Sequence, residues 1–309
     1  MIDGFMSLLM AEQSDVWWLG LLLLGFIVGI ITGMFGIGGG FLLTPALRIF
    51  FNIAYPVAIG TSLLQIMATS LFSVYKQWKQ KNLDLKMGFI TAIGSLIGAE
   101  FGVQLLLVIK SQGTIEIGGQ SILWTDLVIN CCYLILMSTV AILIYRETRN
   151  SSHAEIEEPK TAICKMAQGC SVPPFISFER SEIRHLSLWI PLVPSLFVGC
   201  LTGFLGIGGG FISLPLMIYL LGMPTRIAVG TSTLQVLLAS AYAMLRHLQE
   251  GNVDFMLVLF MFIGSLAGVN AGVKISRKIN VVNTRKYFSF LLLFAIILIT
   301  YDLIHRFWR

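Results

Sequence analysis

The chain of 309 residues is 56% hydrophobic and only 12% charged, and its mean hydropathy is +0.83. This composition excludes a soluble globular protein, because no soluble core of this size uses so much apolar surface, and it predicts a polytopic membrane protein. The net charge of +5 does not indicate a nucleic-acid partner, since the basic residues lie in short loops between apolar spans.

The chain begins with an acidic stretch, 1–16, which contains no basic residue and is predicted to be an extracytoplasmic leader. Trp17 and Trp18 then open the first apolar span, roughly 17–34, as an interfacial pair. This span carries glycines four residues apart, a spacing that favours close packing against another helix.

A glycine segment interrupts the helix after this span, because glycine permits backbone conformations that other residues cannot hold. A short helix is predicted to begin near Pro45, with Thr44 as its cap, and to end near Phe51. At 1.5 Å per residue it is too short to cross a hydrocarbon core of about 30 Å.

Longer spans follow, and the same plan recurs after a polar linker at 146–186, which is expected to be a cytoplasmic and partly disordered connection. The further segments are predicted near 57–77, 86–109, 122–145, 187–205, 211–221, 226–246, 254–275 and 286–305.

An internal duplication explains this recurrence. The segment Gly33–Pro45 returns 170 residues later as Gly203–Pro215, and ten of the 19 positions from Gly29 to Leu47 are identical to their partners at that offset. The same register aligns three further pairs of blocks: 58–65 with 228–235, 82–84 with 252–254, and 94–98 with 264–268. Four blocks in one register indicate two repeats, 17–145 and 187–309.

Five segments per repeat place the two repeats in opposite orientations in the membrane. Of the 21 Lys and Arg residues, 16 lie on the side of the loops that follow odd-numbered segments, and 5 lie on the other side together with both termini. The side rich in positive charge is predicted to face the cytoplasm, so both termini are predicted to be extracytoplasmic. The fold class is therefore all-α, with ten membrane segments in two inverted five-segment repeats and a glycine-broken helical hairpin in each.

The two glycine segments are the first candidate site. A helix broken within the membrane is tolerated only against protein or a wet cavity, and the N-termini of the two short helices would favour an anion there. The alternative is a tight hairpin packed by glycine without a ligand. The candidate cradle consists of Gly36, Gly38, Gly39, Gly40, Gly206, Gly208, Gly209 and Gly210.

A second duplicated motif, Gly-Thr-Ser followed by Gln, supplies hydroxyl and amide groups within about one helical turn. These groups could line the site by bonding an oxyanion, or they could form hydrogen bonds between helices. They are Thr61, Ser62, Gln65, Thr231, Ser232 and Gln235.

Charged residues break the symmetry of the repeat. Glu100 lies deep in its span, opposite Asn270 in the other repeat, and is a candidate for proton coupling; the alternative is a neutral or paired glutamate near the outer face. Arg48, whose partner is Ile218, could bind an anion or extend outward from its short helix. The glycines Gly94, Gly98 and Gly102, with their partners Gly264, Gly268 and Gly272, are predicted to be packing faces.

The doubled Gly-Xaa-Xaa-Gly-Ile-Gly-Gly-Gly-Phe motif, followed by Pro and by Gly-Thr-Ser, resembles the TauE/SafE sulfite exporter family, also called the toluene sulfonate uptake permease family. The resemblance covers nearly the whole chain except 1–16 and 146–186. It implies a transporter of sulfur-containing anions, such as sulfite, sulfoacetate or other organosulfonates, in the bacterial inner membrane.

The sequence thus predicts a secondary transporter for a small anion that works by alternating access, with a passive anion channel as the alternative. An enzyme is not expected, because all four His residues are assigned to loops or the end of the chain and no carboxylates are paired within a span. No cofactor and no metal are expected, since the five Cys residues show no ligand spacing. The expected partners are the small anion and the lipid bilayer.

Overall fold

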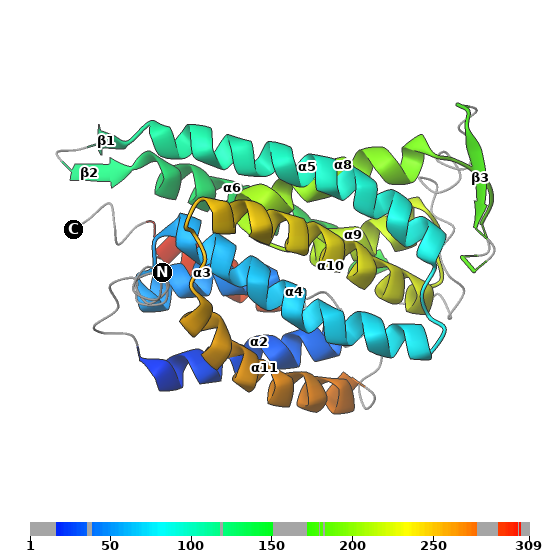
Figure 1. Ribbon diagram of the computed structural model, residues 1–309, viewed down its shortest axis with the longest axis horizontal. Coiled ribbons are helices and arrows are strands. Elements are labelled where there is room, and N and C mark those ends of the chain that lie inside the picture. The colour runs from blue at the N-terminus through cyan, green and yellow to red at the C-terminus, as the bar shows by residue number, and fades with distance from the viewer. Residues whose placement is uncertain are drawn as a thin grey trace, which may run out of the picture.

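The computed structural model describes residues 17–35, 39–117, 120–150, 172–178, 180–181, 183–276, 290–301 and 303. These residues form a bundle of helices that run roughly along its long axis (Figure 1). Within the described ranges, five helical stretches are long and apolar enough to cross a membrane: Tyr55–Lys79, Leu85–Ser111, Trp124–Ile142, Thr225–Gln249 and Phe255–Gly272.

The described residues of the first half form five helices and one strand hairpin, and the helices follow the predicted segments closely. In chain order its elements are α2 (Trp18–Phe35), α3 (Gly40–Phe51), α4 (Tyr55–Lys79), α5 (Leu85–Ser111), β1 (Thr114–Ile117), β2 (Gln120–Leu123) and α6 (Trp124–Asn150).

The second half begins with a hairpin and then repeats the helical order. Its elements are β3 (Phe175–Phe178), β4 (Ile183–Ser187), α8 (Trp189–Leu205), α9 (Gly210–Pro215), the π-helical turn η1 (Leu216–Leu220), α10 (Thr225–Gln249) and α11 (Phe255–Ser276), followed by helical residues Phe290–Tyr301.

The two strand hairpins were not predicted, so the expectation of an all-α chain is wrong in this detail. The strands of each hairpin pair antiparallel, with Thr114 opposite Leu123 and Phe175 opposite Ser187. The second hairpin falls within the linker 146–186 except for its last residue, Ser187. Helix α6 also continues into this linker, to Asn150, and the linker's central part lies outside the described residues. Phe178 is buried against the bundle in a cluster with the ends of several helices, which is why this part of the linker is folded.

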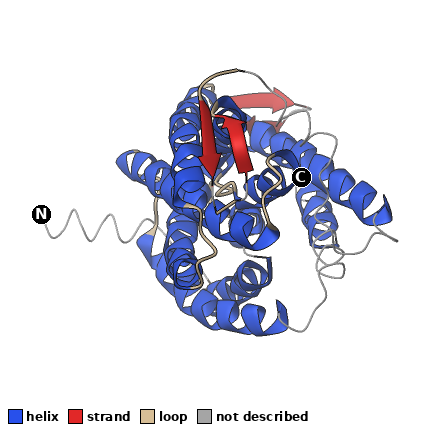
Figure 2. Ribbon diagram, turned by 90° about the vertical axis from the view of Figure 1, so that its right-hand side faces the viewer, coloured by secondary structure: helices blue, strands red, loops and turns tan. Residues whose placement is uncertain are grey.

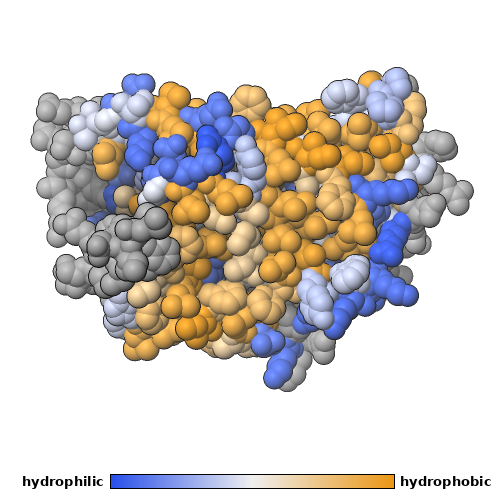
Figure 3. Space-filling view, viewed as in Figure 1, coloured by the Kyte–Doolittle hydropathy of each residue, from blue (hydrophilic) through white to orange (hydrophobic). Residues whose placement is uncertain are grey.

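The bundle has two ends, which we name after their hairpins. At the β1 end lie the start of α2, the turn from α3 to α4 and the hairpin β1–β2 (Figure 1). At the β3 end lie the turns from α4 to α5 and from η1 to α10, together with β3–β4, which covers part of that end in Figure 2. Between the two ends the visible surface is mainly apolar (Figure 3).

The broken hairpins differ from prediction at one point, the start of the short helix. Helix α3 begins at Gly40, and Pro45 lies inside it instead of opening it. Thr44 is therefore not the cap. Gly39 precedes the helix with φ 60°, and Gly209 occupies the equivalent place before α9 with φ 68°. Glycine adopts this left-handed conformation without strain, so each helix can begin directly after the turn.

The two halves are joined by glycine faces that contact the backbone of the opposite half. Helix α2 packs along α11, and α5 packs along α8. An ideal Cβ on Gly98 would lie 1.9 Å from the Leu196 carbonyl oxygen, and one on Gly268 would lie 2.1 Å from that of Phe26. The prediction that the four-residue glycine spacings form packing faces is confirmed.

A single methyl group at this interface should separate α5 from α8. We expect Gly98→Ala to lower the free energy of unfolding by about 1–3 kcal/mol, because the overpacked backbone contact outweighs the helix propensity that alanine gains. The measurement is the thermal unfolding of the protein in detergent.

The matched control for this prediction is Ile97→Ala on the same helix, because the Ile97 side chain is 46% exposed. It should leave the melting temperature within a few degrees of the parent. Equal melting temperatures for Gly98→Ala and Ile97→Ala would contradict the close backbone contact.

Candidate functional site

The two glycine segments meet in the interior of the bundle. The rings of Phe41 and Phe211, which follow the two segments, are both buried with their centroids 5.3 Å apart. An ideal Cβ on Gly40 would lie 2.6 Å from the carbonyl oxygen of Ile207. Among the candidate glycines, Gly39 and Gly40 in the first segment and 206 to 210 in the second are buried, whereas Gly36 and Gly38 lie outside the described residues.

Side-chain donors surround the carbonyl end of α8 at the second glycine segment. The Ser62 hydroxyl donates to the Gly206 carbonyl at 3.2 Å, and the Thr44 hydroxyl lies 2.7 Å from that of Ser62. The Tyr133 hydroxyl donates to the Leu205 carbonyl at 2.6 Å. Carbonyls at the end of a helix lack intrahelical partners, so these hydroxyls supply hydrogen bonds to the carbonyls at the break. The structure therefore places Ser62 beside the second glycine segment, where its hydroxyl is hydrogen-bonded to other protein groups.

The threonines of the Gly-Thr-Ser motif link the two halves in a reciprocal way. Thr61 accepts from the backbone N–H of Asp254 at 3.1 Å, and Thr231 accepts from that of Asp84 at 3.1 Å. Asp84 caps α5 by accepting from the N–H of Met87, and Asp254 accepts in the same way from Leu257 before α11. Desolvation raises the pKa of the Asp254 carboxyl, against the lowering effect of the two N–H groups that bond it.

The glutamines form a second reciprocal pair of contacts. Gln65 donates to the Ser265 hydroxyl at 2.9 Å, and Gln235 donates to that of Ser95 at 2.6 Å. Ser232, the last of the six candidates, donates to the carbonyl of Val229 in its own helix at 3.0 Å. The sequence allows these side chains two roles, an anion site or hydrogen bonds between helices. In the structure the threonines and glutamines form hydrogen bonds between helices.

A large cavity lies beside the first glycine segment, with a volume of about 780 Å³. Its inner part is lined by Thr32 and Gly33 at the end of α2 and by Ser265, the partner of Gln65. The last turn of α4, which lies at the β3 end in Figure 1, lines the cavity with Lys76 and Lys79. The cavity therefore connects a basic rim at one end of the bundle with the interior near the glycine segments.

Neither Lys76 nor Lys79 is among the site residues predicted from the sequence, because the sequence places both in a loop, whereas the structure places them in the last turn of α4. The signal that could have found them is their position in the repeat. Lys76 and Arg246 occupy equivalent places 170 residues apart, each in the last turn of its helix. His247 was also placed in a loop, and this is wrong. It lies in α10, is 1% exposed, and its Nε2 lies 3.1 Å from the Gly203 carbonyl oxygen.

Arg48 is paired with Asp126, which is not among the site residues predicted from the sequence. Its guanidinium forms a buried ion pair with Asp126 in the first turn of α6 and donates to the Ile53 carbonyl at 3.3 Å. It also lies over the ring of Tyr55, 5.6 Å from the ring centroid. Asp126 neutralises the charge that Arg48 would offer to an anion.

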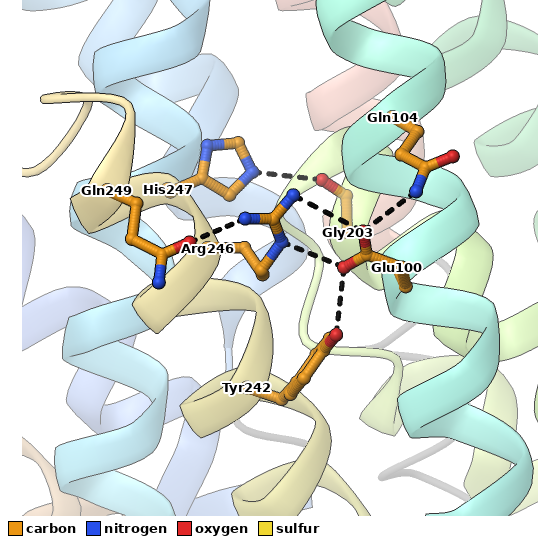
Figure 4. A network of polar contacts seen from close by, with 7 residues as sticks. All are labelled: Glu100, Gln104, Gly203, Tyr242, Arg246, His247 and Gln249. Carbon is orange, nitrogen blue, oxygen red and sulfur yellow. Dashed lines mark hydrogen bonds and ion pairs between the residues drawn. The ribbon is translucent and has the colours of Figure 1, made fainter.

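Glu100 lies on α5 in a network with α10 (Figure 4). Its carboxylate accepts from Nε of Arg246 at 2.8 Å and from Nη2 of the same residue at 3.2 Å. The Tyr242 hydroxyl and the Gln104 amide each donate to it at 2.8 Å. Every one of these contacts uses the carboxylate as an acceptor, so the network suits the ionised form.

The comparison with known proteins agrees with this architecture. The profile of the family described as sulfite exporter TauE/SafE matches residues 21–299. The chain belongs to this family. The resemblance stated from the doubled glycine motif is confirmed, and the chain is a membrane transporter of the TauE/SafE family.

Named relatives of this TauE/SafE chain come from bacteria and an archaeon. The probable membrane transporter protein YunE of Bacillus subtilis is 29% identical over 265 residues, covering 84% of this chain and 88% of the relative. A probable membrane transporter protein of Haemophilus influenzae is 26% identical over 285 residues, with coverages of 88% and 91%. One from Methanocaldococcus jannaschii is 25% identical over 274 residues, with coverages of 84% and 86%. No solved structure matches the chain.

The Arg48–Asp126 contact allows a test of whether Arg48 serves stability or substrate. We expect Asp126→Leu alone to lower the free energy of unfolding by about 3–5 kcal/mol, because it leaves a buried guanidinium without its counter-ion. The double variant Arg48→Leu/Asp126→Leu should recover most of this loss. The measurement is a double-mutant cycle on thermal unfolding.

Anion flux through the double variant provides the functional half of this test. A folded double variant that keeps the parent's flux assigns Arg48 to structure alone. A folded double variant without flux would contradict that role and return Arg48 to the substrate site.

Proposed function

We propose that this chain is a secondary transporter that moves a small sulfur-containing anion across the bacterial inner membrane by alternating access. Sulfite, sulfoacetate and other organosulfonates are the proposed substrates. The observation that carries the proposal is the cavity of about 780 Å³, which joins a basic rim at the β3 end to the interior beside the first glycine segment.

The reciprocal contacts support two inverted repeats as the basis of this mechanism. Thr61 and Thr231 make the same bond to the opposite half, and so do Gln65 and Gln235. Helices α2 and α8, which are equivalent in the repeat, begin at opposite ends of the bundle (Figure 1). Transporters with inverted repeats bind substrate where the repeats meet and expose it to each side in turn.

The distribution of charge supports a cytoplasmic position for the β3 end. Lys76, Lys79, Lys81 and Lys86 surround the turn from α4 to α5 at this end. Positive residues favour the cytoplasmic side, so the cavity would open to the cytoplasm and the termini would lie outside. An anion that enters from the cytoplasm would be exported, the direction for which the family is named.

The glycine segments remain our proposal for the place where the anion is held. The N-terminus of a helix carries the positive end of the helix dipole and the N–H groups that lack a partner one turn earlier, so the starts of α3 and α9 would favour an anion. The cavity reaches Gly33, three residues before the first segment. The Gln65 Oε1 atom is buried and has no hydrogen-bond partner among the described residues, so this amide can reorient when a ligand arrives.

Glu100 is the proposed site of proton coupling. A protonated Glu100 could no longer accept every bond that it now receives from Arg246, Tyr242 and Gln104, so proton uptake would loosen the contact between α5 and α10. This would link the proton to a movement between elements of the two halves.

Selective stabilisation by a sulfur anion tests the proposed substrate class. We expect sulfite or an organosulfonate to raise the melting temperature of the purified protein at fixed ionic strength, whereas sulfate and chloride do not. A ligand present at 100 times its Kd stabilises the folded state by about 2.7 kcal/mol. The double variant Lys76→Gln/Lys79→Gln should weaken the response several-fold, and more at low salt, because these side chains attract the anion to the rim.

The control for charge is Lys110→Gln, since Lys110 is also exposed but lies in the last turn of α5 at the β1 end. It should leave the anion response unchanged. A flat response to all sulfur anions would overturn the substrate class. Flux through proteoliposomes that rises without saturation would favour a passive channel over a transporter.

A further inference from the structure

The large cavity at the β3 end has a counterpart in the repeat that is closed. Cavity residues Phe72, Lys76 and Asn270 correspond, at the repeat offset, to Tyr242, Arg246 and Glu100. The three residues that line the cavity at the β3 end therefore correspond to the three that are bonded to one another between α5 and α10.

A residue deeper in the cavity shows the same contrast. Ser73 lines the open cavity, whereas its counterpart Ala243 is fully buried. The counterpart space between α5 and α10 is thus occupied by packed side chains.

The Glu100–Arg246 contact has the geometry and position expected of a contact that holds α5 and α10 together near the β1 end. Two nitrogens of the guanidinium bond the two carboxylate oxygens, which is the strong bidentate form of this pair. The pair joins α5 of one half to α10 of the other, and each side chain is about one quarter exposed, 28% for Glu100 and 27% for Arg246. The network lies nearer the β1 end than the β3 end, because it involves the last two turns of α10.

Polar groups lie directly behind this pair. The imidazole of His247, next to Arg246 in the sequence, contacts the Gly203 carbonyl near the end of α8 (Figure 4). His247 Nδ1 is buried and has no hydrogen-bond partner in the described part of the chain. A path opened between α5 and α10 would therefore reach polar atoms near the second glycine segment, as the open cavity reaches the first.

We propose that the Glu100–Arg246 ion pair is the gate at the β1 end, and that Arg246 becomes the anion-binding group of this end when the gate opens. A sulfite or sulfonate group offers oxygens that a guanidinium can bind in the same bidentate way as a carboxylate. Glu100 occupies that position in the closed state, so the substrate and Glu100 compete for Arg246. This assignment rests on the proposed function for the identity of the anion, but the gate itself can be tested without it.

Chemical accessibility of two equivalent positions tests the gate. In a variant without native cysteines, Ala243→Cys reports on the β1 end and Ser73→Cys reports on the cavity at the β3 end. Each is labelled by a membrane-impermeant thiol reagent that is added from its own side of a vesicle. With the ion pair intact we expect slow labelling at position 243 and fast labelling at position 73.

Breaking the pair should reverse this pattern. We expect Glu100→Gln to speed labelling at position 243 by about five- to tenfold and to slow it at position 73, because alternating access opens one end only when the other closes. The charge-swapped variant Glu100→Arg/Arg246→Glu should restore slow labelling at 243. The matched control Ile97→Ala changes an exposed residue three positions before Glu100 on α5 and keeps the whole network, so it should leave both rates near those of the parent.

The outcomes separate the gate from the function on which its substrate rests. Faster labelling at 243 without slower labelling at 73 would mean local loosening and would overturn the gate, as would unchanged rates at both positions. A reciprocal change in the rates together with no protection by sulfite or sulfoacetate would keep the gate and refute the sulfur anion. Protection of position 243 in Glu100→Gln that is lost in Glu100→Gln/Arg246→Gln assigns the anion to Arg246.

Discussion

The close approach of backbones from the two halves is the constraint on which this structure depends. Backbone carbonyls of α8 lie where Cβ atoms would lie on the glycines of α5. Backbone carbonyls of α2 lie in the equivalent positions next to the glycines of α11. Side chains at these positions would push the halves apart, so each half has glycine every fourth residue along these helices. Each broken hairpin packs on a long helix of the other half, so the main hydrophobic cluster contains buried residues from both halves.

This arrangement determines which parts can move together. Helix α2 with α11, and α5 with α8, are in backbone contact over much of their length and should move as two rigid pairs. Thr61 and Thr231 fasten the starts of α11 and α5 to the opposite half. The glycine segments lie at the ends of α2 and α8, so a displacement of one pair relative to the other would change the geometry of the proposed cradle directly.

The sequence predicted the helical framework well because the framework depends on local signals. The span expected at 57–77 is the helix Tyr55–Lys79, and the glycine spacings correctly marked the packing faces. Spacing identifies a face but not the helix that covers it, so the pairing of α5 with α8 could not be derived. The same limit hid the Arg48–Asp126 pair, whose members are distant in the sequence. His247 was misplaced because α10 continues to Gln249, three residues beyond the predicted end of its span.

The sequence could not decide the roles of the candidate site residues, because a polar side chain within a membrane protein can serve two purposes. Hydroxyls and amides can bind a ligand or form hydrogen bonds within the protein, and in this structure the Gly-Thr-Ser and Gln residues mainly do the latter. What distinguishes the two ends is charge at equivalent positions. At the β3 end Lys76 lines the cavity together with Asn270, which cannot pair with it as a carboxylate would, whereas at the β1 end the equivalent residues Arg246 and Glu100 attract each other. A symmetric scaffold with these charges is expected to be open at the β3 end and closed at the β1 end. An anion that arrives changes the electrostatic interactions at both ends at once.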